Sequence, residues 1–345
     1  MIVAGVSTSH CVYATCRDAK GSFNDVNLCD ETKKRTTSCQ NLLLKEVSTA
    51  AARVAPVLSG RLSVCLDASW RGWRWVLELP SDQIAYVAED DQGWARLCRE
   101  QKLLELLAEA VSFRVPVIEA VAKAERVQLR RKAPGTAGFP IEAMVFGSSE
   151  ETPTASRYRP DSPLTAAGQC LAHDLGRAIA EMQRAVSAEE AVTLGFPTLS
   201  FIERWEAVSA WFSERDDLAD LRVAVSPLRC WFEELAPDPV FCHGDLGMHN
   251  MAVDRSTGAL SGIFDFDEAA VAHRLEDFKY LPSFGIAFTR LALDAYANEM
   301  ETRLSLDDVG RFHVLSAVEH FLFVSEDSAR WPHIVEWTRR ALDCF

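Results

Sequence analysis

The sequence has no long apolar run and no pattern of a secretory leader. No stretch among its 345 residues approaches the roughly 18 consecutive apolar residues that a membrane-spanning helix requires. Its N-terminus also lacks a basic region followed by an apolar core, which is the pattern of a signal peptide. These absences predict a cytoplasmic protein that has no membrane partner.

Three common catalytic signatures are missing too. The sequence contains no Gly-x-x-x-x-Gly-Lys-Ser/Thr run, no His-Glu-x-x-His and no Gly-x-Ser-x-Gly. The first is the phosphate loop of P-loop enzymes, the second binds zinc in metalloproteases, and the third carries the nucleophile of serine hydrolases. Their absence disfavours a P-loop nucleotide fold and removes these two hydrolase classes.

Cysteine pairs with metal-binding spacing are also absent, although the chain has ten cysteines. Because no Cys-x-x-Cys pair occurs, a zinc site or a disulfide framework among Cys11, Cys16, Cys29 and Cys39 is the less favoured alternative. Several other cysteines lie in apolar contexts and are expected to be buried as small hydrophobic side chains. This usage is typical of a reducing compartment.

Basic residues are few relative to acidic ones. The chain has 36 Lys and Arg against 50 Asp and Glu, a formal net charge of −14. This balance argues against nucleic acid or an anionic membrane surface as the main partner. The excess acid either favours a cationic substrate or only keeps the protein soluble, and both explanations stay open. With 48% hydrophobic residues, the chain can form one large domain or two smaller ones.

The most informative stretch reads Val-Phe-Cys-His-Gly-Asp-Leu-Gly-Met-His-Asn over residues 240–250. The apolar residues at its start predict a short strand that ends before His243-Gly244. The Asp245 carboxylate then lies at the mouth of a loop. His249 is expected to be an exposed loop residue.

Two further short strands are predicted at residues 251–253 and 260–264, on either side of a turn. Such a chain reversal brings Asn250, before the first strand, close to Asp265, after the second. Asp245 lies on the loop beside them. One amide and two carboxylates are thereby predicted to share one end of a hairpin.

These three side chains are the set that phosphoryl transfer requires. Asp245 would orient the attacking hydroxyl and accept its proton, and Asn250 and Asp265 would hold Mg²⁺ against the nucleotide phosphates. The alternative is a β-hairpin whose polar residues only cap turns. The occurrence of all three residues in this order, in a strand-loop-strand context, favours the catalytic interpretation.

The form His-Gly-Asp-Leu-x-x-x-Asn, followed by Ile-x-Asp-Phe-Asp over residues 263–267, resembles the aminoglycoside phosphotransferase and choline kinase branch of the kinase-like superfamily. The resemblance covers roughly residues 55–325 and is specific between residues 240 and 278. It implies an α+β, two-lobed protein-kinase-like fold, with a small antiparallel β lobe and a larger, mainly helical lobe. It also implies transfer of the γ-phosphoryl group of ATP, with Mg²⁺, to a hydroxyl group of a small molecule.

The resemblance implies further roles for named residues. Asp277 stands where the family has an Asp that anchors the catalytic loop from behind, and His243 is expected to hold this loop by hydrogen bonds. Gly60 and Ser63 fall where the phosphate-covering loop would lie, although an ordinary hairpin turn explains them equally well. Glu100 matches, by position, the helical glutamate that pairs with a strand lysine in active kinases.

The sequence departs from the family at this strand lysine, because Glu78 stands at the position where it is expected. Glu78 and Glu100 would then face one another, and two acids cannot form the usual ion pair. Three accounts are open. The alignment is shifted, or a basic residue from elsewhere (Arg74, Arg61 or Lys132) approaches the phosphates, or ATP affinity is reduced. The last account supports an alternative function, a nucleotide-binding pseudokinase that acts as an interaction protein.

Three regions are predicted along the chain. Residues 1–45 form a poorly ordered leader or appended segment, residues 46–135 the small nucleotide-binding lobe, and residues 136–345 the helical lobe with the catalytic hairpin and substrate cleft. The small lobe is predicted to contain strands at 64–67, 74–79, 115–118 and 126–132 and a helix at 94–110. Helices of the large lobe are predicted at 164–186, 201–212, 225–235, 284–300, 305–323 and 331–342. The acceptor and the oligomeric state are left open by the sequence.

Overall fold

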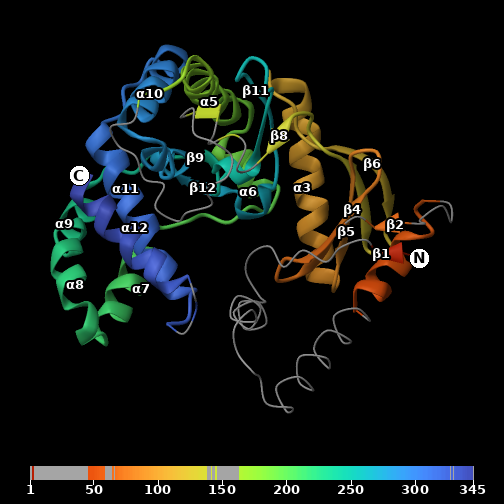
Figure 1. Ribbon diagram of the computed structural model, residues 1–345, viewed down its shortest axis with the longest axis horizontal. Helices are drawn as coiled ribbons and strands as arrows, with labels where there is room; N and C mark the ends of the chain where they lie inside the picture. The colour runs from red at the N-terminus through yellow and green to blue at the C-terminus, as the bar shows by residue number, and fades with distance from the viewer. Residues whose placement is uncertain are drawn as a thin grey trace, which may run out of the picture. The chain divides into compact units, whose positions relative to one another are not determined.

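The computed structural model describes residues 2–3, 46–58, 64–65, 67–137, 141, 144–145, 163–326, 328 and 330–344. The chain divides into two compact units (Figure 1). The first unit comprises Met1–Gln101 and Pro116–Lys132, and the second comprises Lys102–Val115 and Ala133–Phe345. Almost all of the predicted leader, and also Gly60, Arg61 and Ser63, lie outside the described residues.

The first unit is built on a five-stranded antiparallel sheet of order β3-β4-β5-β7-β6. The long helix α3 (Asp91–Ala110) follows β5 in the chain and ends in the second unit. A parallel pair, β1 (Ile2–Val3) and β2 (Val64–Cys65), forms a separate small sheet. The main sheet consists of β3 (Asp67–Trp70), β4 (Arg74–Leu79), β5 (Gln83–Ala88), β6 (Val117–Ala122) and β7 (Val127–Arg131).

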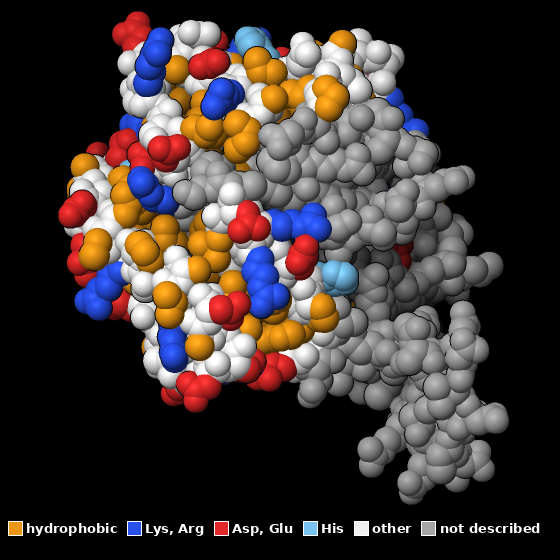
Figure 2. Space-filling model, turned by 60° about the vertical axis from the view of Figure 1, so that its left-hand side comes forward, with side chains coloured by type: hydrophobic (Ala, Val, Ile, Leu, Met, Phe, Trp, Pro, Cys, Tyr) orange, Lys and Arg blue, Asp and Glu red, His pale blue; other side chains and the backbone are white. Residues whose placement is uncertain are grey.

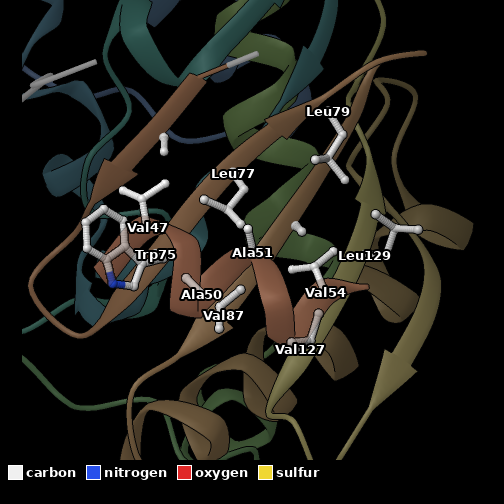
Figure 3. Packing of buried hydrophobic residues seen from close by; sticks show 12 residues of the cluster. Val47, Ala50, Ala51, Val54, Trp75, Leu77, Leu79, Val87, Val127 and Leu129 are labelled. Carbon is white, nitrogen blue, oxygen red and sulfur yellow. The ribbon is translucent and has the colours of Figure 1, made fainter. Parts of the chain in front are cut away.

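Alternating side chains give this sheet two buried faces. A helix at residues 46–54 covers one face, and Figure 3 shows its Val and Ala side chains against Leu77 and Val87. On the other face, Tyr86 and Ala88 pack with Leu97 of α3. Full burial of a Val or Leu side chain contributes about 1.5–3 kcal/mol, so this N-terminal helix is a structural part of the unit.

Strand β5 is absent from the sequence prediction, which assigns no strand between residues 79 and 94. The loop from β4 to β5 carries two non-glycine residues with positive φ, Ser81 (65°) and Asp82 (57°). No Gly or Asn marks this reversal, although those residues favour positive φ. The near-continuous burial of β5 also removes the alternation that identifies a half-exposed strand.

Two small sheets lie in the second unit. Strand β9 (Pro239–Cys242) pairs antiparallel with β12 (Ala270–His273). The other sheet has the order β11-β10-β8, from β11 (Leu260–Ile263), β10 (Met251–Val253) and β8 (Thr136–Ala137). The predicted hairpin of residues 251–264 is thereby confirmed.

Helices make up most of the rest of this unit, as the sequence predicts. They are α5 (Ala166–Ala185), α6 (Ala188–Thr193), α7 (Phe201–Ser213), α8 (Ala219–Val225), α9 (Leu228–Glu234), α10 (Ile286–Met300), α11 (Leu306–Glu319) and α12 (Trp331–Cys344). Short 3₁₀ turns are η1 (Asp216–Leu218), η2 (Met248–Asn250), η3 (Phe266–Glu268), η4 (Arg274–Phe278), η5 (Leu281–Phe284) and η6 (His320–Leu322). None of the described helices is both long and apolar enough to cross a membrane.

The most extensive packing among the described helices of this unit joins α5 to α10, which lie side by side in Figure 1. Gly176 of α5 permits it, because a Cβ atom there would lie 2.0 Å from the carbonyl oxygen of Ala292. A larger residue at this position would force the two helices apart.

Candidate active site

The candidate site lies in the second unit, at the end of the hairpin. Strand β9 ends at Cys242, the loop follows, and β10 begins directly after Asn250. Met251 pairs with Ile263, and the Phe264 backbone N–H donates to the Asn250 carbonyl oxygen at 3.0 Å. Asn250 and Asp265 therefore flank the same end of the hairpin.

A sharp turn at Gly244 sets the direction of the loop that follows β9. Its φ is 81°, and a Cβ atom there would lie 2.2 Å from the Glu268 carbonyl oxygen, so only glycine fits. Buried Asp277 of η4 accepts from the backbone N–H of His243 (3.1 Å) and from that of Gly244 (3.0 Å). The structure thus places Asp277 behind the loop; its effect on catalysis stays a prediction.

His243 connects the loop to the second strand of the hairpin. Its Nδ1 accepts from the Asp245 backbone N–H at 3.3 Å, so the ring proton is on Nε2, which donates to the Phe264 carbonyl oxygen at 3.1 Å. The ring is fully buried and packs on Phe266 at 4.6 Å between centroids. Both ring nitrogens of His243 are thus used to hold the loop.

The Asp245 carboxylate is held from one side. Its Oδ2 accepts from Asn250 Nδ2 at 2.9 Å and from His249 Nε2 at 3.0 Å. Burial raises the pKa of Asp245, but the hydrogen bond and charge of His249, with His243 and Lys279, outweigh it and lower this pKa to about 2. The carboxylate is therefore ionised at neutral pH and can accept a hydrogen bond from a hydroxyl group.

The contact of His249 with Asp245 is absent from the sequence prediction, which describes His249 only as an exposed loop residue. The His249 side chain is indeed 61% exposed, yet it reaches the carboxylate. The only sign of this contact in the sequence is the i,i+4 spacing of the two residues. This spacing brings the side chains together only because residues 248–250 form a 3₁₀ turn.

The residues present fit a magnesium ion in their donor chemistry. Asn250 Nδ2 donates to both Oδ2 and the carbonyl oxygen of Asp245, the latter at 2.8 Å, so its Oδ1 remains as an acceptor. Asp265 follows β11 in a left-handed conformation, with φ 65° and ψ 65°. Mg²⁺ prefers such oxygen donors and commonly takes one or two from the protein, with phosphate and water completing its shell. The described part of the chain contains no group of three or more His, Cys, Asp or Glu side chains that could hold a metal ion. A magnesium ion at Asn250 and Asp265 would therefore take the rest of its ligands from phosphate and water.

Further acids lie next to the hairpin end. The pKa of Glu268 is raised by burial and by the negative charges of Asp267 and Asp245. On the face of the molecule that Figure 2 shows, by contrast, acidic and basic side chains are interspersed among hydrophobic ones. The net negative charge of the chain is therefore not gathered into one patch on that face.

A buried charge network lies next to Asp277. Glu276 Oε1 contacts Lys279 Nζ at 2.5 Å, and its Oε2 contacts an Arg204 guanidinium nitrogen at 2.6 Å. Arg204, from α7, also binds Glu319 of α11 through two nitrogens. Burial raises the pKa of Glu276, but Lys279 and Arg204 outweigh it and lower this pKa to about 2. No sequence pattern marks this network, because its members are scattered over more than a hundred residues.

In the first unit, Glu100 of α3 binds two buried arginines. Its carboxylate lies 2.9 Å from an Arg130 guanidinium nitrogen and 3.4 Å from one of Arg74. Both guanidinium groups stack on Tyr86 of β5, at 4.3 Å and 4.8 Å from the ring centroid. These positions come from β7 and β4, on either side of β5.

The predicted opposition of Glu78 and Glu100 is wrong. Glu78 pairs instead with Lys132 at 3.2 Å. The alignment is shifted because the strand that precedes α3 is β5 rather than β4, so the position expected for the lysine lies among the β5 side chains that face α3, which are Ile84, Tyr86 and Ala88. Glu78 belongs to β4, where it is paired with Ile84 near the end of the strand. Glu100 thus has basic partners, although β5 supplies no lysine.

A sequence model of the phosphotransferase enzyme family matches residues 54–308. Curated proteins give no match. Among solved structures, the GDP complex of wild-type aminoglycoside 2'-phosphotransferase-IIIa is 18% identical, with a TM-score of 0.62, over 85% of this chain and 97% of that chain.

Two other solved structures are similar. Macrolide 2'-phosphotransferase MphH from Brachybacterium faecium, an apoenzyme, is 18% identical, with a TM-score of 0.55, over 78% of this chain and 86% of that chain. The streptomycin-ATP-APH(2")-IIa ternary complex is 14% identical, with a TM-score of 0.54, over 92% of this chain and 97% of that chain. These likenesses show the fold, and the predicted kinase-like α+β fold is confirmed.

Proposed function

Because the chain belongs to the phosphotransferase enzyme family, we propose that it transfers the γ-phosphoryl group of ATP to a hydroxyl group of a small molecule, in the cytoplasm and with Mg²⁺ as cofactor. The observation that carries this proposal is the geometry at the hairpin end. There an ionised Asp245 is hydrogen-bonded to Asn250, and Asn250 and Asp265 flank the same pair of strands.

Each residue has a defined part in the proposed reaction. The acceptor hydroxyl donates its hydrogen bond to the Asp245 carboxylate, which takes the proton as the new P–O bond forms and the bond to the leaving ADP breaks. Oδ1 of Asn250 and the carboxylate of Asp265 would hold Mg²⁺, which neutralises charge on the phosphates when bound. His243 and Asp277 keep the loop backbone in place through the contacts described above.

Nucleotide binding in the first unit is a separate part of the proposal. Glu100 pairs with the buried Arg74 and Arg130 guanidinium groups, to which we assign the ion-pairing role of the missing strand lysine toward the helical glutamate. Gly60 and Ser63, which lie outside the described residues, keep their proposed place in the phosphate-covering loop. The absence of lysine from β5 also favours a second candidate, a nucleotide-binding pseudokinase that acts as an interaction protein.

A binding assay followed by a turnover assay tests both candidates. The thermal unfolding midpoint is measured with Mg·ATP and Mg·GTP, with and without EDTA, because nucleotide-bound relatives include GDP and ATP complexes. Phosphorylation is then measured by mass spectrometry against aminoglycosides, macrolides, choline-like alcohols, homoserine and sugars. Binding with turnover supports the phosphotransferase, binding without any turnover supports the pseudokinase, and neither contradicts both.

The variant Asp245→Asn separates chemistry from folding. It preserves side-chain shape but removes the proton acceptor, so we expect turnover to fall at least about 1,000-fold while Mg·ATP binding persists. A purified Asp245→Asn protein that turns over at the wild-type rate would contradict the assignment of the base.

A further inference from the structure

We propose that His249 is a positioning residue for the reaction: it holds one oxygen of Asp245 so that the other oxygen receives the acceptor hydroxyl. This inference rests on the proposed function. It concerns a histidine whose contact with the carboxylate is visible only in the folded loop.

The backbone of the loop places the His249 ring next to Asp245. The Gly247 backbone N–H donates to the Asp245 carbonyl oxygen at 2.9 Å, and that of Asn250 donates to the Gly247 carbonyl oxygen at 3.0 Å. The resulting turn brings the His249 ring over Gly247, where a Cβ atom would lie 2.5 Å from ring atom Cε1. Gly247 therefore provides the space that the ring occupies.

The hydrogen bonds distinguish the two oxygens of Asp245. Oδ2 accepts from Asn250 Nδ2 and from His249 Nε2, at 2.9 Å and 3.0 Å. A carboxylate has about four acceptor positions, two on each oxygen, so these two donors saturate Oδ2. The incoming hydroxyl is left with Oδ1.

Exposure places this pair within reach of a small molecule. The Asp245 side chain is 30% exposed beside the more exposed His249 ring. The hydrogen bond from Asn250 alone would leave the carboxylate free to rotate about its Cβ–Cγ bond, because one donor does not fix the plane of the group. With His249 in place, two donors from different directions fix the plane of the carboxylate.

The proton balance of the step follows. The acceptor oxygen forms its bond to the γ-phosphorus, its proton moves to Oδ1 of Asp245, and the nucleoside diphosphate leaves with the electron pair of the broken bond. His249 keeps its Nε2 proton, which forms the hydrogen bond to Oδ2, and takes no part in the proton transfer. In this step His249 therefore positions the carboxylate, in addition to lowering the pKa of Asp245 as described above.

The test compares variants by steady-state kinetics with Mg·ATP and the acceptor found in the library screen. His249→Leu is expected to lower kcat about 10- to 100-fold, with the KM of both substrates unchanged, because a misplaced catalytic group costs rate rather than binding. His249→Gln supplies an N–H donor and should restore kcat to within about fivefold of wild type. Gly247→Ala should also lower kcat, since its Cβ atom displaces the ring.

The matched control is His173→Leu, an exposed histidine of α5, which should leave all kinetic constants unchanged. A wild-type kcat in His249→Leu would overturn the positioning role while the proposed function stands. A raised KM for the acceptor in both His249 variants, with kcat retained, would overturn it as well, because His249 would then bind the acceptor. A wild-type protein without Mg·ATP binding and without turnover would remove the proposed function and this inference with it.

Discussion

Single side chains behind the catalytic loop fix its backbone, and Asp277 provides the clearest test. Its two oxygens accept from two consecutive backbone N–H groups, at 3.1 Å and 3.0 Å. We expect Asp277→Ala to lower the free energy of unfolding by about 2–4 kcal/mol, because it leaves both buried donors without an acceptor. Urea denaturation measures this loss.

Asp254 is the matched control for Asp277. Its Oδ1 also accepts from two backbone N–H groups, those of Ser256 and Thr257, but on an exposed turn where water can replace it. Asp254→Ala should therefore cost much less than Asp277→Ala. Equal losses in the two variants would show that burial of the loop donors is not what makes Asp277 necessary.

Sequence reasoning finds some of these side chains and misses others for physical reasons. The order of Asp245, Asn250 and Asp265 on two short strands predicts their shared location, because local strand and turn patterns determine it. The His249 contact depends on a 3₁₀ turn, and the Arg204 network depends on helices that are distant in sequence. Neither leaves a periodic signal.

At the level of whole elements, one missed strand changes the interpretation of the first unit. The sequence predicts its general architecture, an antiparallel sheet with a helix, but the positive-φ loop at Ser81 and Asp82 conceals β5. The expected lysine position therefore falls on the wrong strand. With β5 in its place, Glu78 is a partly exposed residue that pairs with Lys132. Glu100 lies between the buried Arg74 and Arg130 guanidinium groups.

This assignment predicts unequal losses of stability for two similar substitutions. Glu100→Gln should lower the free energy of unfolding by about 3–5 kcal/mol, since it removes the carboxylate between two buried guanidinium groups. Glu78→Gln should cost less than about 1 kcal/mol, because the Glu78 side chain is 44% exposed in its pair with Lys132. Urea denaturation of both variants is the measurement, and a larger loss in Glu78→Gln would contradict the assignment.

The stability of the whole molecule should depend on pH through a histidine that no catalytic motif includes. His313 of α11 is fully buried. Trp337 Nε1–H donates to its Nε2 at 3.2 Å, so its proton is on Nδ1, which donates to the Lys279 carbonyl oxygen at 2.6 Å. Protonation would direct a second N–H toward the Trp337 donor. The neutral ring thus joins α12 to the segment that follows η4.

The direction of the pH effect follows from the shift. Burial lowers the pKa of His313 to about 4, from about 6.5 in the unfolded chain. Between these values the unfolded chain binds the proton and the folded protein does not. The contribution of His313 to the free energy of unfolding is therefore fully present above about pH 6.5 and is lost as the pH decreases toward 4. The loss should reach about 3 kcal/mol. Urea denaturation between pH 7 and pH 4 should show a shallower slope in His313→Gln than in the wild type or in His173→Gln, whose histidine is exposed; His273 and His320, whose pKa values burial also lowers, contribute to the slope in all three proteins. An equal slope in His313→Gln and the wild type would show that His313 does not contribute to the acid sensitivity.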